Sequence, residues 1–156
     1  MCIYSCIYPV DFIKEAYRLL RPDGRFIITT PNVLNINSRL SYLLSGFFVL
    51  FGPVSLNKDD SGGLLGHIMP LSYYYLDYFM RNHGFLQVEL LIDKIKRSAL
   101  LYYSLLFPLI RPASLIRRIN ISKKNPGLFE KNREQIKLMN CFKIFCSRSC
   151  ILVGYK

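Results

Sequence analysis

Residues 9–32 read PVDFIKEAYRLLRPDGRFIITTPN, and this stretch decides the fold. Within residues 10–20, apolar side chains recur at the i, i+3, i+4, i+7 spacing of an amphipathic helix. A proline-aspartate-glycine turn at residues 22–24 stops the helix, and we expect Gly24 to supply the left-handed conformation needed there. Residues 25–30 form a β-branched and aromatic run typical of a buried strand. The stretch therefore predicts a helix, a tight turn and a strand of an α/β sheet.

The rest of the chain shows further periodic segments. They predict a helix over residues 38–51, a helix over 72–83, a strand over 85–93, a helix over 94–119 broken near Pro108 and Pro112, and a final strand or hairpin over 142–155. In the strand, Leu86, Val88, Leu90 and Ile92 are expected on one face. Ser72 is expected to cap the second helix, and Gly84 suits the position just after its end.

Length and composition indicate one folded domain. The chain has 156 residues, of which 51% are hydrophobic and 20% charged, and this excludes a disordered protein. The mean hydropathy of +0.22 is high for a soluble domain and indicates apolar surface that meets a membrane or a missing segment. The formal net charge of +11 attracts anions, but it does not choose between nucleic acid, anionic lipid and a phosphorylated substrate.

The cysteines and histidines indicate neither a disulfide framework nor a metal site. The five cysteines include no C-x-x-C pair, and the two histidines lie far apart, so no metal-ligand spacing occurs. We interpret the cysteines as reduced, packed thiols of a cytoplasmic protein. The N-terminus lacks the basic region of a signal peptide.

Two uncharged stretches raise the question of a membrane. Residues 98–110 are too short to span a bilayer, which takes about 20 apolar residues. Residues 40–56 come closer, but Gly46, Gly52 and Pro53 interrupt them. Association in the plane of the membrane is therefore expected rather than a crossing.

The opening stretch resembles a known family. Its pattern E-x-x-R-x-L-[KR]-P-x-G, followed by a strand ending in TPN, is similar to the region around the fifth strand of class I S-adenosylmethionine-dependent methyltransferases. The matching residues are Glu15, Arg18, Leu20, Arg21, Pro22, Gly24, Thr30, Pro31 and Asn32. The resemblance implies an α/β fold: an incomplete Rossmann-like methyltransferase sheet made of the C-terminal strands, with flanking helices.

The similarity continues to the C-terminus. His67, Pro70, Leu71 and Ser72, followed by Gly84-Phe85, look like the segment that precedes the family's sixth strand. The ending CFKIFCSRSCILVGYK is similar to the family's last strand, which runs antiparallel to the others. The chain is thus interpreted as a single partial domain over residues 1–156, with a variable helical insert of basic and apolar residues over 94–139.

The half of the family's domain that holds the cofactor is missing. S-adenosylmethionine binds at a glycine-rich loop after a first strand, and the sequence contains no G-x-G-x-x-G. Residues 61–66 have glycines without a preceding buried strand, so we interpret them as a lid or connector. Only eight residues precede Pro9, so at most a remnant of the fourth strand is expected there, beside an open sheet edge. The chain alone is not expected to bind S-adenosylmethionine tightly.

Three residues are candidates for a site, each with a structural alternative. His67 is the candidate catalytic base, or a loop histidine bonded to backbone. Asn32 follows the strand at the ligand-binding edge of an α/β sheet and is a candidate for substrate binding, or a turn residue capping its own loop. Tyr73 is a second candidate for substrate binding, or a core residue. His83 is expected on a buried helix face.

Residues 97–124 join a long apolar run to a basic cluster. They are interpreted either as an in-plane anchor on anionic lipid at the inner membrane surface, or as a helical cap with a solvated basic end. The function implied by the resemblance is methyl transfer to a small-molecule, glycan or lipid-linked acceptor, by a chain inactive without a partner segment that completes the sheet. The alternative is a non-catalytic remnant that acts as a membrane-surface or partner-binding module. The sequence contains no motif of interleaved aromatic and basic residues that would indicate specific nucleic-acid binding.

Overall fold

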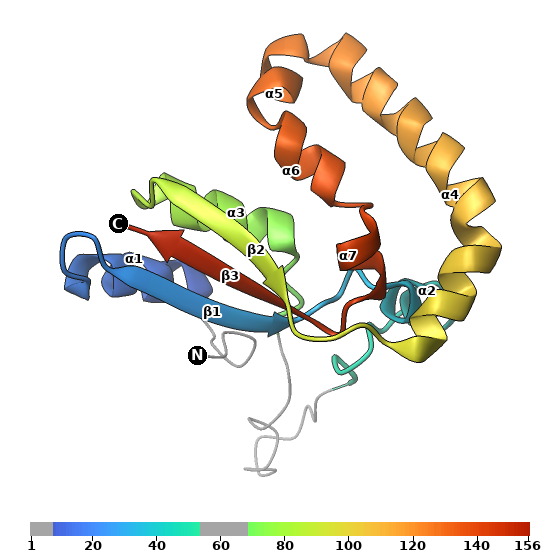
Figure 1. Ribbon diagram of the computed structural model, residues 1–156, viewed down its shortest axis with the longest axis horizontal. Helices are drawn as coiled ribbons and strands as arrows, with labels where there is room; N and C mark the ends of the chain where they lie inside the picture. Colours follow the sequence, from blue (N-terminus) through green and yellow to red (C-terminus); the bar gives the residue numbers. More distant parts are fainter. Residues whose placement is uncertain (1–7, 54–68) are drawn as a thin grey trace.

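The computed structural model describes residues 8–53 and 69–156 and shows a mixed helix and sheet fold (Figure 1). The described sheet has three strands in the order β1-β3-β2. They are β1 (Arg25–Pro31), β2 (Gln87–Ile92) and β3 (Ser149–Tyr155). The last strand in sequence, β3, lies in the middle and runs antiparallel to both neighbours. It follows that β1 and β2 are parallel to each other, and the expected antiparallel last strand is confirmed.

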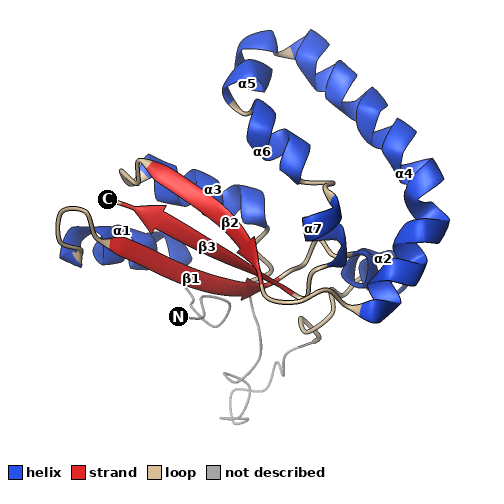
Figure 2. Cartoon of the chain, viewed as in Figure 1, coloured by secondary structure: helices blue, strands red, loops and turns tan. Residues whose placement is uncertain are grey.

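Two helices, α1 (Pro9–Leu19) and α3 (Tyr73–Asn82), pack on one face of the sheet (Figure 2). Between helices and sheet lies the main core, in which Ile13, Ile28, Leu76, Met80 and Leu152 have no exposed surface. Ile28 lies opposite Leu152 in the register. The neighbouring Ile27 points to the other face and is 51% exposed, so β1 is buried on one face and not on both as expected for a strand of this composition.

The turn between α1 and β1 uses its residues differently from the prediction. Asp23 has the positive φ, +61°, and Gly24 does not. Aspartate tolerates the left-handed region because its short polar side chain can bond locally. Gly24 is needed for space, since a Cβ there would lie 2.7 Å from the carbonyl oxygen of Arg21.

The end of α3 confirms the role predicted for Gly84. The N–H of Gly84 donates to the carbonyl of Arg81, and that of Phe85 donates to the carbonyl of Met80, at 3.1 and 3.2 Å. These are the two bonds of a Schellman motif, with Gly84 at φ +108°. Ser72 stands at the N-cap as predicted, but its side chain makes no capping bond and its hydroxyl is buried without a partner among the described residues.

The predicted break at the two prolines is wrong. The helix α4 (Arg97–Lys124) continues for 28 residues through both Pro108 and Pro112. A proline inside a helix frees the carbonyl four residues earlier. Both prolines are exposed, so they lie on the side of α4 where water can hydrate the carbonyls of Ser104 and Pro108.

Other segment boundaries also differ from the predictions. The helix α2 (Ile36–Ser45) ends at Gly46, whose φ of +76° stops it six residues before the expected end at residue 51. The first part of the expected C-terminal strand is a helix, α7 (Phe142–Cys146). Leu86 precedes β2 and is exposed, whereas Val88 is buried as expected.

Helix α4 leads away from the sheet, and two short helices, α5 (Pro126–Lys131) and α6 (Arg133–Leu138), bring the chain back to α7 (Figure 1). We call α4, α5 and α6 the helical arm. Its base is a small second core that contains Ile36, Ala99, Phe145 and Cys146. Cys141, Cys146 and Cys150 are free thiols, and burial raises the pKa of Cys150 to about 12. The open sheet edge expected beside β1 depends on residues outside the described ranges and stays a prediction.

Candidate functional site

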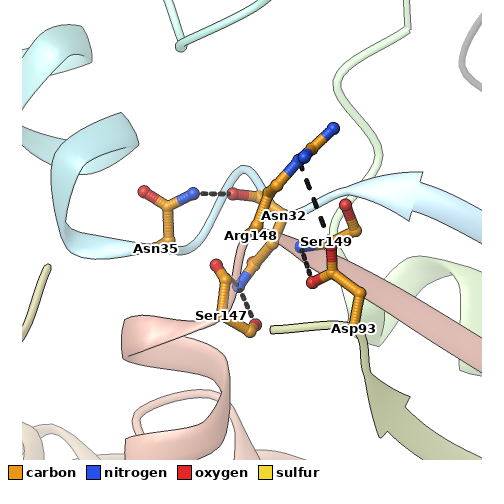
Figure 3. Close-up of polar contacts among 6 residues, drawn as sticks. All are labelled: Asn32, Asn35, Asp93, Ser147, Arg148 and Ser149. Carbon is orange, nitrogen blue, oxygen red and sulfur yellow. Dashed lines mark hydrogen bonds and ion pairs between the residues drawn. The ribbon is translucent and has the colours of Figure 1, made fainter. Parts of the chain in front are cut away.

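The carboxyl ends of β1 and β2 meet the start of β3, and polar side chains gather at this junction (Figure 3). Asn32 follows β1, Asp93 follows β2, and Ser147 and Arg148 precede β3. The N–H of Asn32 donates to the carbonyl of Arg148 at 3.1 Å, which extends the pairing of β1 with β3 by one residue. The antiparallel direction of β3 therefore brings residues more than one hundred positions apart to one edge of the sheet.

The side chain of Asn32 is buried and bonded within the chain at both ends of its amide. Its Nδ2 donates to the carbonyl of Ile144 and to the hydroxyl of Ser147, the latter at 2.8 Å. Its Oδ1 accepts from the N–H of Leu34 at 3.0 Å. These bonds join β1 to α7 and close the turn after β1, which is the structural role weighed for this residue. Substrate binding by Asn32 stays a prediction.

Asn35 continues the network into α2. Its Nδ2 donates to the carbonyl of Asn32 at 2.8 Å (Figure 3). Its Oδ1 accepts from the N–H of Ser38 at 2.9 Å. The second bond is the N-cap of α2, where a short polar side chain satisfies a free helix N–H. The loop after β1 and the start of α2 are thereby fixed relative to the sheet.

Asp93 closes the same junction from the β2 side. Its Oδ1 accepts from the N–H of Ser149 at 2.9 Å, and its Oδ2 lies 4.0 Å from Nε of Arg148 (Figure 3). Partial burial alone would raise the pKa of Asp93, but the hydrogen bonds from the backbone of Lys94 and Ser149 and the charge of Arg148 together lower it. The carboxylate is therefore ionised at neutral pH, and it holds the end of β2 against the start of β3.

The predicted tyrosine lies in the core. Tyr73 is buried in the main core, where desolvation first and the charge of Asp77 second raise the pKa of its hydroxyl. The next two residues, Tyr74 and Tyr75, line a hollow beside the helical arm instead. The structure thus places the neighbours of Tyr73 at a surface that a ligand can reach, and the role of Tyr73 itself stays a prediction.

His67 lies outside the described residues, so its role as a base stays a prediction. His83 forms the C-cap of α3, and its Nε2 is buried with no hydrogen-bond partner in the described part of the chain. Within residues 8–53 and 69–156, no three His, Cys, Asp or Glu side chains lie together as a metal site would require.

A groove runs between α4 and the returning part of the arm. It comprises two cavities of about 390 and 440 Å³ that share Ser114, Arg118 and Asn140. The first is lined further by aromatic and apolar side chains with two basic ones: Tyr103, Phe107, Ile110, Leu115, Cys141, Phe142, Arg111 and Lys137. The second adds Arg117 and, from α3, Tyr74 and Tyr75. Neither lining contains an aspartate or glutamate.

One wall of the groove is fixed to the junction at the sheet edge. Asn140 donates from Nδ2 to the hydroxyl of Ser114 at 2.9 Å and accepts from Nη1 of Arg39 at 2.8 Å. Arg39 also donates to the carbonyls of Leu34 and Met139, and it lies over the ring of Phe145. Burial lowers the pKa of Arg39 to about 10, which leaves it charged at neutral pH. Arg39 thus connects the loop after β1 to Asn140 in the wall of the groove.

This groove was not predicted from the sequence, although its basic residues lie in segments that the sequence shows to be basic. Arg111, Arg117 and Arg118 belong to the segment over residues 97–124 that joins an apolar run to a basic cluster, and Lys137 belongs to the helical insert predicted over residues 94–139. Only the return of the chain through α5 and α6 brings Lys137 and Asn140 opposite α4. Short helices with few apolar residues leave little periodic signal, so this return could not be predicted.

The described strands do not provide a cradle for S-adenosylmethionine. The family's cofactor rests on a glycine-rich loop at a helix N-terminus, where the backbone approaches the ligand closely. After β1 the chain reads PNVLN, and its turn is filled by the bonds of Asn32 and Asn35. After β2 it reads DKIK, where Asp93 bonds to Ser149. These residues do not fit the cofactor.

Comparisons with known proteins leave the family undecided. No family model matches the chain, and no curated protein matches it. A solved structure that is similar is the Haemonchus contortus phosphoethanolamine N-methyltransferase 2, in complex with phosphomonomethylethanolamine and S-adenosylhomocysteine. The TM-score is 0.40 and the identity 11%, and the match covers 99% of this chain and 31% of that one. The chain thus spans about a third of its neighbour, and so distant a likeness carries no argument about activity.

Proposed function

We propose that this chain is the C-terminal part of a class I S-adenosylmethionine-dependent methyltransferase domain and carries the acceptor side of its site. The sequence stretch 9–32 that resembles the family comprises α1, a Pro-Asp-Gly turn and β1, and this order of elements supports the proposal. The observation that carries the proposal is the topology of the sheet: two parallel strands with the reversed last strand between them.

The cofactor site belongs to another segment under this proposal. Nothing at the ends of β1 and β2 fits S-adenosylmethionine, and the sequence contains no G-x-G-x-x-G motif that would supply the site elsewhere. When bound in a complete domain, the cofactor supplies the methyl group. The residues of this chain then have the task of orienting an acceptor, and the junction around Asn32 keeps the sheet edge in place for it.

Two measurements test the proposal. Calorimetric titration of the purified chain with S-adenosylmethionine is expected to show no binding at micromolar concentrations. Reading the genomic sequence upstream of Met1 is expected to show a strand followed by a glycine-rich loop, in frame or in an adjacent frame. Micromolar affinity of the chain alone would contradict the proposal, and so would an upstream sequence with no such motif in any frame.

His67 remains the proposed base where the acceptor is a hydroxyl, because the unperturbed pKa of histidine is near 6.5. In a full-length homologue that carries the same histidine, replacement by alanine should lower kcat strongly with little change in KM for the acceptor. An unchanged kcat would end this assignment.

A second candidate function, a module bound at a membrane surface, is favoured by the outer face of α4. Exposed apolar residues three or four positions apart form one stripe along the helix: Leu101, Leu105, Pro108, Leu109, Pro112, Ile116 and Ile119. Over these 18 residue steps the stripe is about 27 Å long. It contains no charged residue, and Lys123 and Lys124 follow at its end. An apolar helix face with basic residues beside it is typical of a helix lying on anionic lipid.

Helix α4 is better suited to lie on a membrane than to cross it. In the described part of the chain it is the one helix long and apolar enough to span, with a mean hydropathy of 1.5 in its best window and 6% of that window buried. Its first turns, however, pack against the domain: Ala99 is fully buried, and Tyr103 contacts the rings of Phe142 and Phe145. Crossing a bilayer would break these contacts, whereas lying on its surface keeps them.

Vesicle sedimentation tests this second function. The chain should bind vesicles of phosphatidylcholine that contain about 30% phosphatidylglycerol, a share that gives the vesicle surface a net negative charge. Added salt should weaken this binding. The double variant Leu105→Ser/Leu109→Ser should bind about tenfold less tightly, because two exposed leucines lose apolar contact. The matched control Leu19→Ser/Leu86→Ser changes equally exposed leucines outside the arm and should bind as the wild type. Equal loss in both variants, or no binding at low salt, would contradict the membrane role.

A further inference from the structure

The groove along α4 combines the two features that an amphiphilic anion requires. We infer that it binds a molecule with a phosphate-type head group and an apolar tail. The inference needs neither methyl transfer nor membrane binding, since it depends only on the walls of the groove.

The basic residues of the groove have no carboxylate partners. Arg111, Arg117, Arg118 and Lys137 form no ion pair within residues 8–53 and 69–156, where the four ion pairs involve other arginines. Neither cavity lining contains an acidic residue. Four cations around one hollow repel each other, and an anion between them relieves the repulsion. The formal net charge of +11 strengthens the attraction over the whole chain.

Arg118 identifies where the head group would bind. It lies in the lining shared by both cavities, and its Nε is buried without a hydrogen-bond partner in the described residues. Leaving a buried N–H unpaired is costly, so such a group indicates a ligand that completes it. A guanidinium fits phosphate oxygens in a bidentate arrangement, and the neighbouring Arg117 adds a second guanidinium at the same wall.

The tail would lie on the aromatic side of the groove. Tyr103 packs edge-on against Phe142, with ring centroids 5.3 Å apart, and it also contacts Phe107 at 5.0 Å. Ile110 and Leu115 extend this apolar wall. Two adjoining cavities of about 390 and 440 Å³ lie in the size range of small-molecule sites, which are mostly apolar with a few polar groups that fix the ligand.

Calorimetry on the full chain with three probes tests the inference: octyl phosphate below its micelle concentration, octyl glucoside with the same tail and no charge, and inorganic phosphate with no tail. Octyl phosphate is expected to bind at least tenfold more tightly than either of the others. If octyl glucoside binds as tightly as octyl phosphate, the groove recognises only apolar tails. If inorganic phosphate binds as tightly as octyl phosphate, the groove recognises only anions. Either result, or no binding of octyl phosphate, overturns the inference.

Three variants locate the site. Arg118→Gln should weaken octyl phosphate binding about tenfold, through loss of a charge-assisted bond, and should keep the melting temperature because its Nε has no partner to lose. Lys137→Gln, at an exposed position, should weaken binding by a smaller factor without risk to folding. Arg21→Gln removes the same charge at an exposed site outside the groove and should leave binding unchanged. Equal loss in Arg21→Gln, or unchanged binding in both groove variants, would contradict the assignment.

Discussion

Two regions of the molecule use apolar residues in opposite ways. One is the sheet with helices α1 and α3, which we call the sheet unit, and the other is the helical arm. In the sheet unit, Ile28, Leu76 and Leu152 have no exposed surface. In the arm, Ala99 is the only buried residue of α4, and no described residue of α5 or α6 is buried. The sheet unit therefore carries most of the buried core, and the arm exposes apolar surface and the groove. The difference shows that a high apolar content does not by itself indicate a large core.

The largest expected difference between the two regions comes from removing a leucine side chain. Leu152→Ala in β3 should lower the free energy of unfolding by about 2–5 kcal/mol, because it leaves a cavity in the main core. Leu109→Ala on the outer face of α4, which is 70% exposed, should change it by less than about 0.5 kcal/mol. Urea denaturation followed by circular dichroism measures both. Similar losses in the two variants would show that the arm is part of the same core.

A pair of glycine replacements gives the next largest effect, with opposite signs. Gly84→Ala should lower the free energy of unfolding by about 2 kcal/mol, because φ is +108° and the new Cβ would lie 2.7 Å from the ring of Tyr17. Gly127→Ala, in α5 of the arm, meets nothing within 4 Å and has no positive φ. It should raise stability by a few tenths of a kcal/mol, up to about 1, through helix propensity. Thermal melts of both variants test this, and a destabilised Gly127→Ala variant would contradict it.

Asparagine replacements separate the junction at the sheet edge from the arm. Asn32→Ala leaves the hydroxyl of Ser147 and the N–H of Leu34 without their partner, and should cost about 1–3 kcal/mol of stability. Asn120→Ala, at an exposed position of α4, should cost less than about 0.5 kcal/mol. Equilibrium unfolding in urea distinguishes the two. A neutral Asn32→Ala variant would remove the structural role and favour a ligand-binding role for Asn32.

The smallest effect is expected from the carboxylate of Asp93. Its pKa is lowered in the folded chain, so its contribution is fully present above the unfolded value of about 3.9 and is lost as pH falls through the folded value. Asp93→Asn should therefore be less stable than the wild type at pH 7 by less than about 1 kcal/mol, and the gap should close below about pH 4. Unfolding at pH 7, 5 and 3 measures this. A gap that widens toward low pH would contradict the lowered pKa.

Much of the sheet unit could be predicted from sequence, because its signals are local. The α1 periodicity, the residue 22–24 turn and the run of residues 25–30 each specify one element, and Gly84 ends α3 as expected. The error at Asp23 arose because two adjacent turn residues can both adopt a positive φ, and sequence alone does not choose between them.

The arm and the candidate site could not be predicted in the same way. Pro108 and Pro112 read as helix breaks, and they are tolerated only because they lie on the exposed side of α4, which is a property of packing. The bonds of Asn32 to Ser147 and the meeting of Arg118 with Lys137 around one hollow join distant segments. Such contacts depend on the return of the chain through α5, α6 and α7, which has no periodic signature.

The order of the strands supports the account more than any other feature, and nuclear magnetic resonance tests it most directly. In a labelled sample, backbone protons of Leu152 should show nuclear Overhauser effects to those of both Ile28 and Leu90, the residues opposite it in β1 and β2. Direct effects between Ile28 and Leu90, with Leu152 remote from both, would place β3 outside the pair. That result would contradict the reversed central strand and the proposed methyltransferase relationship with it.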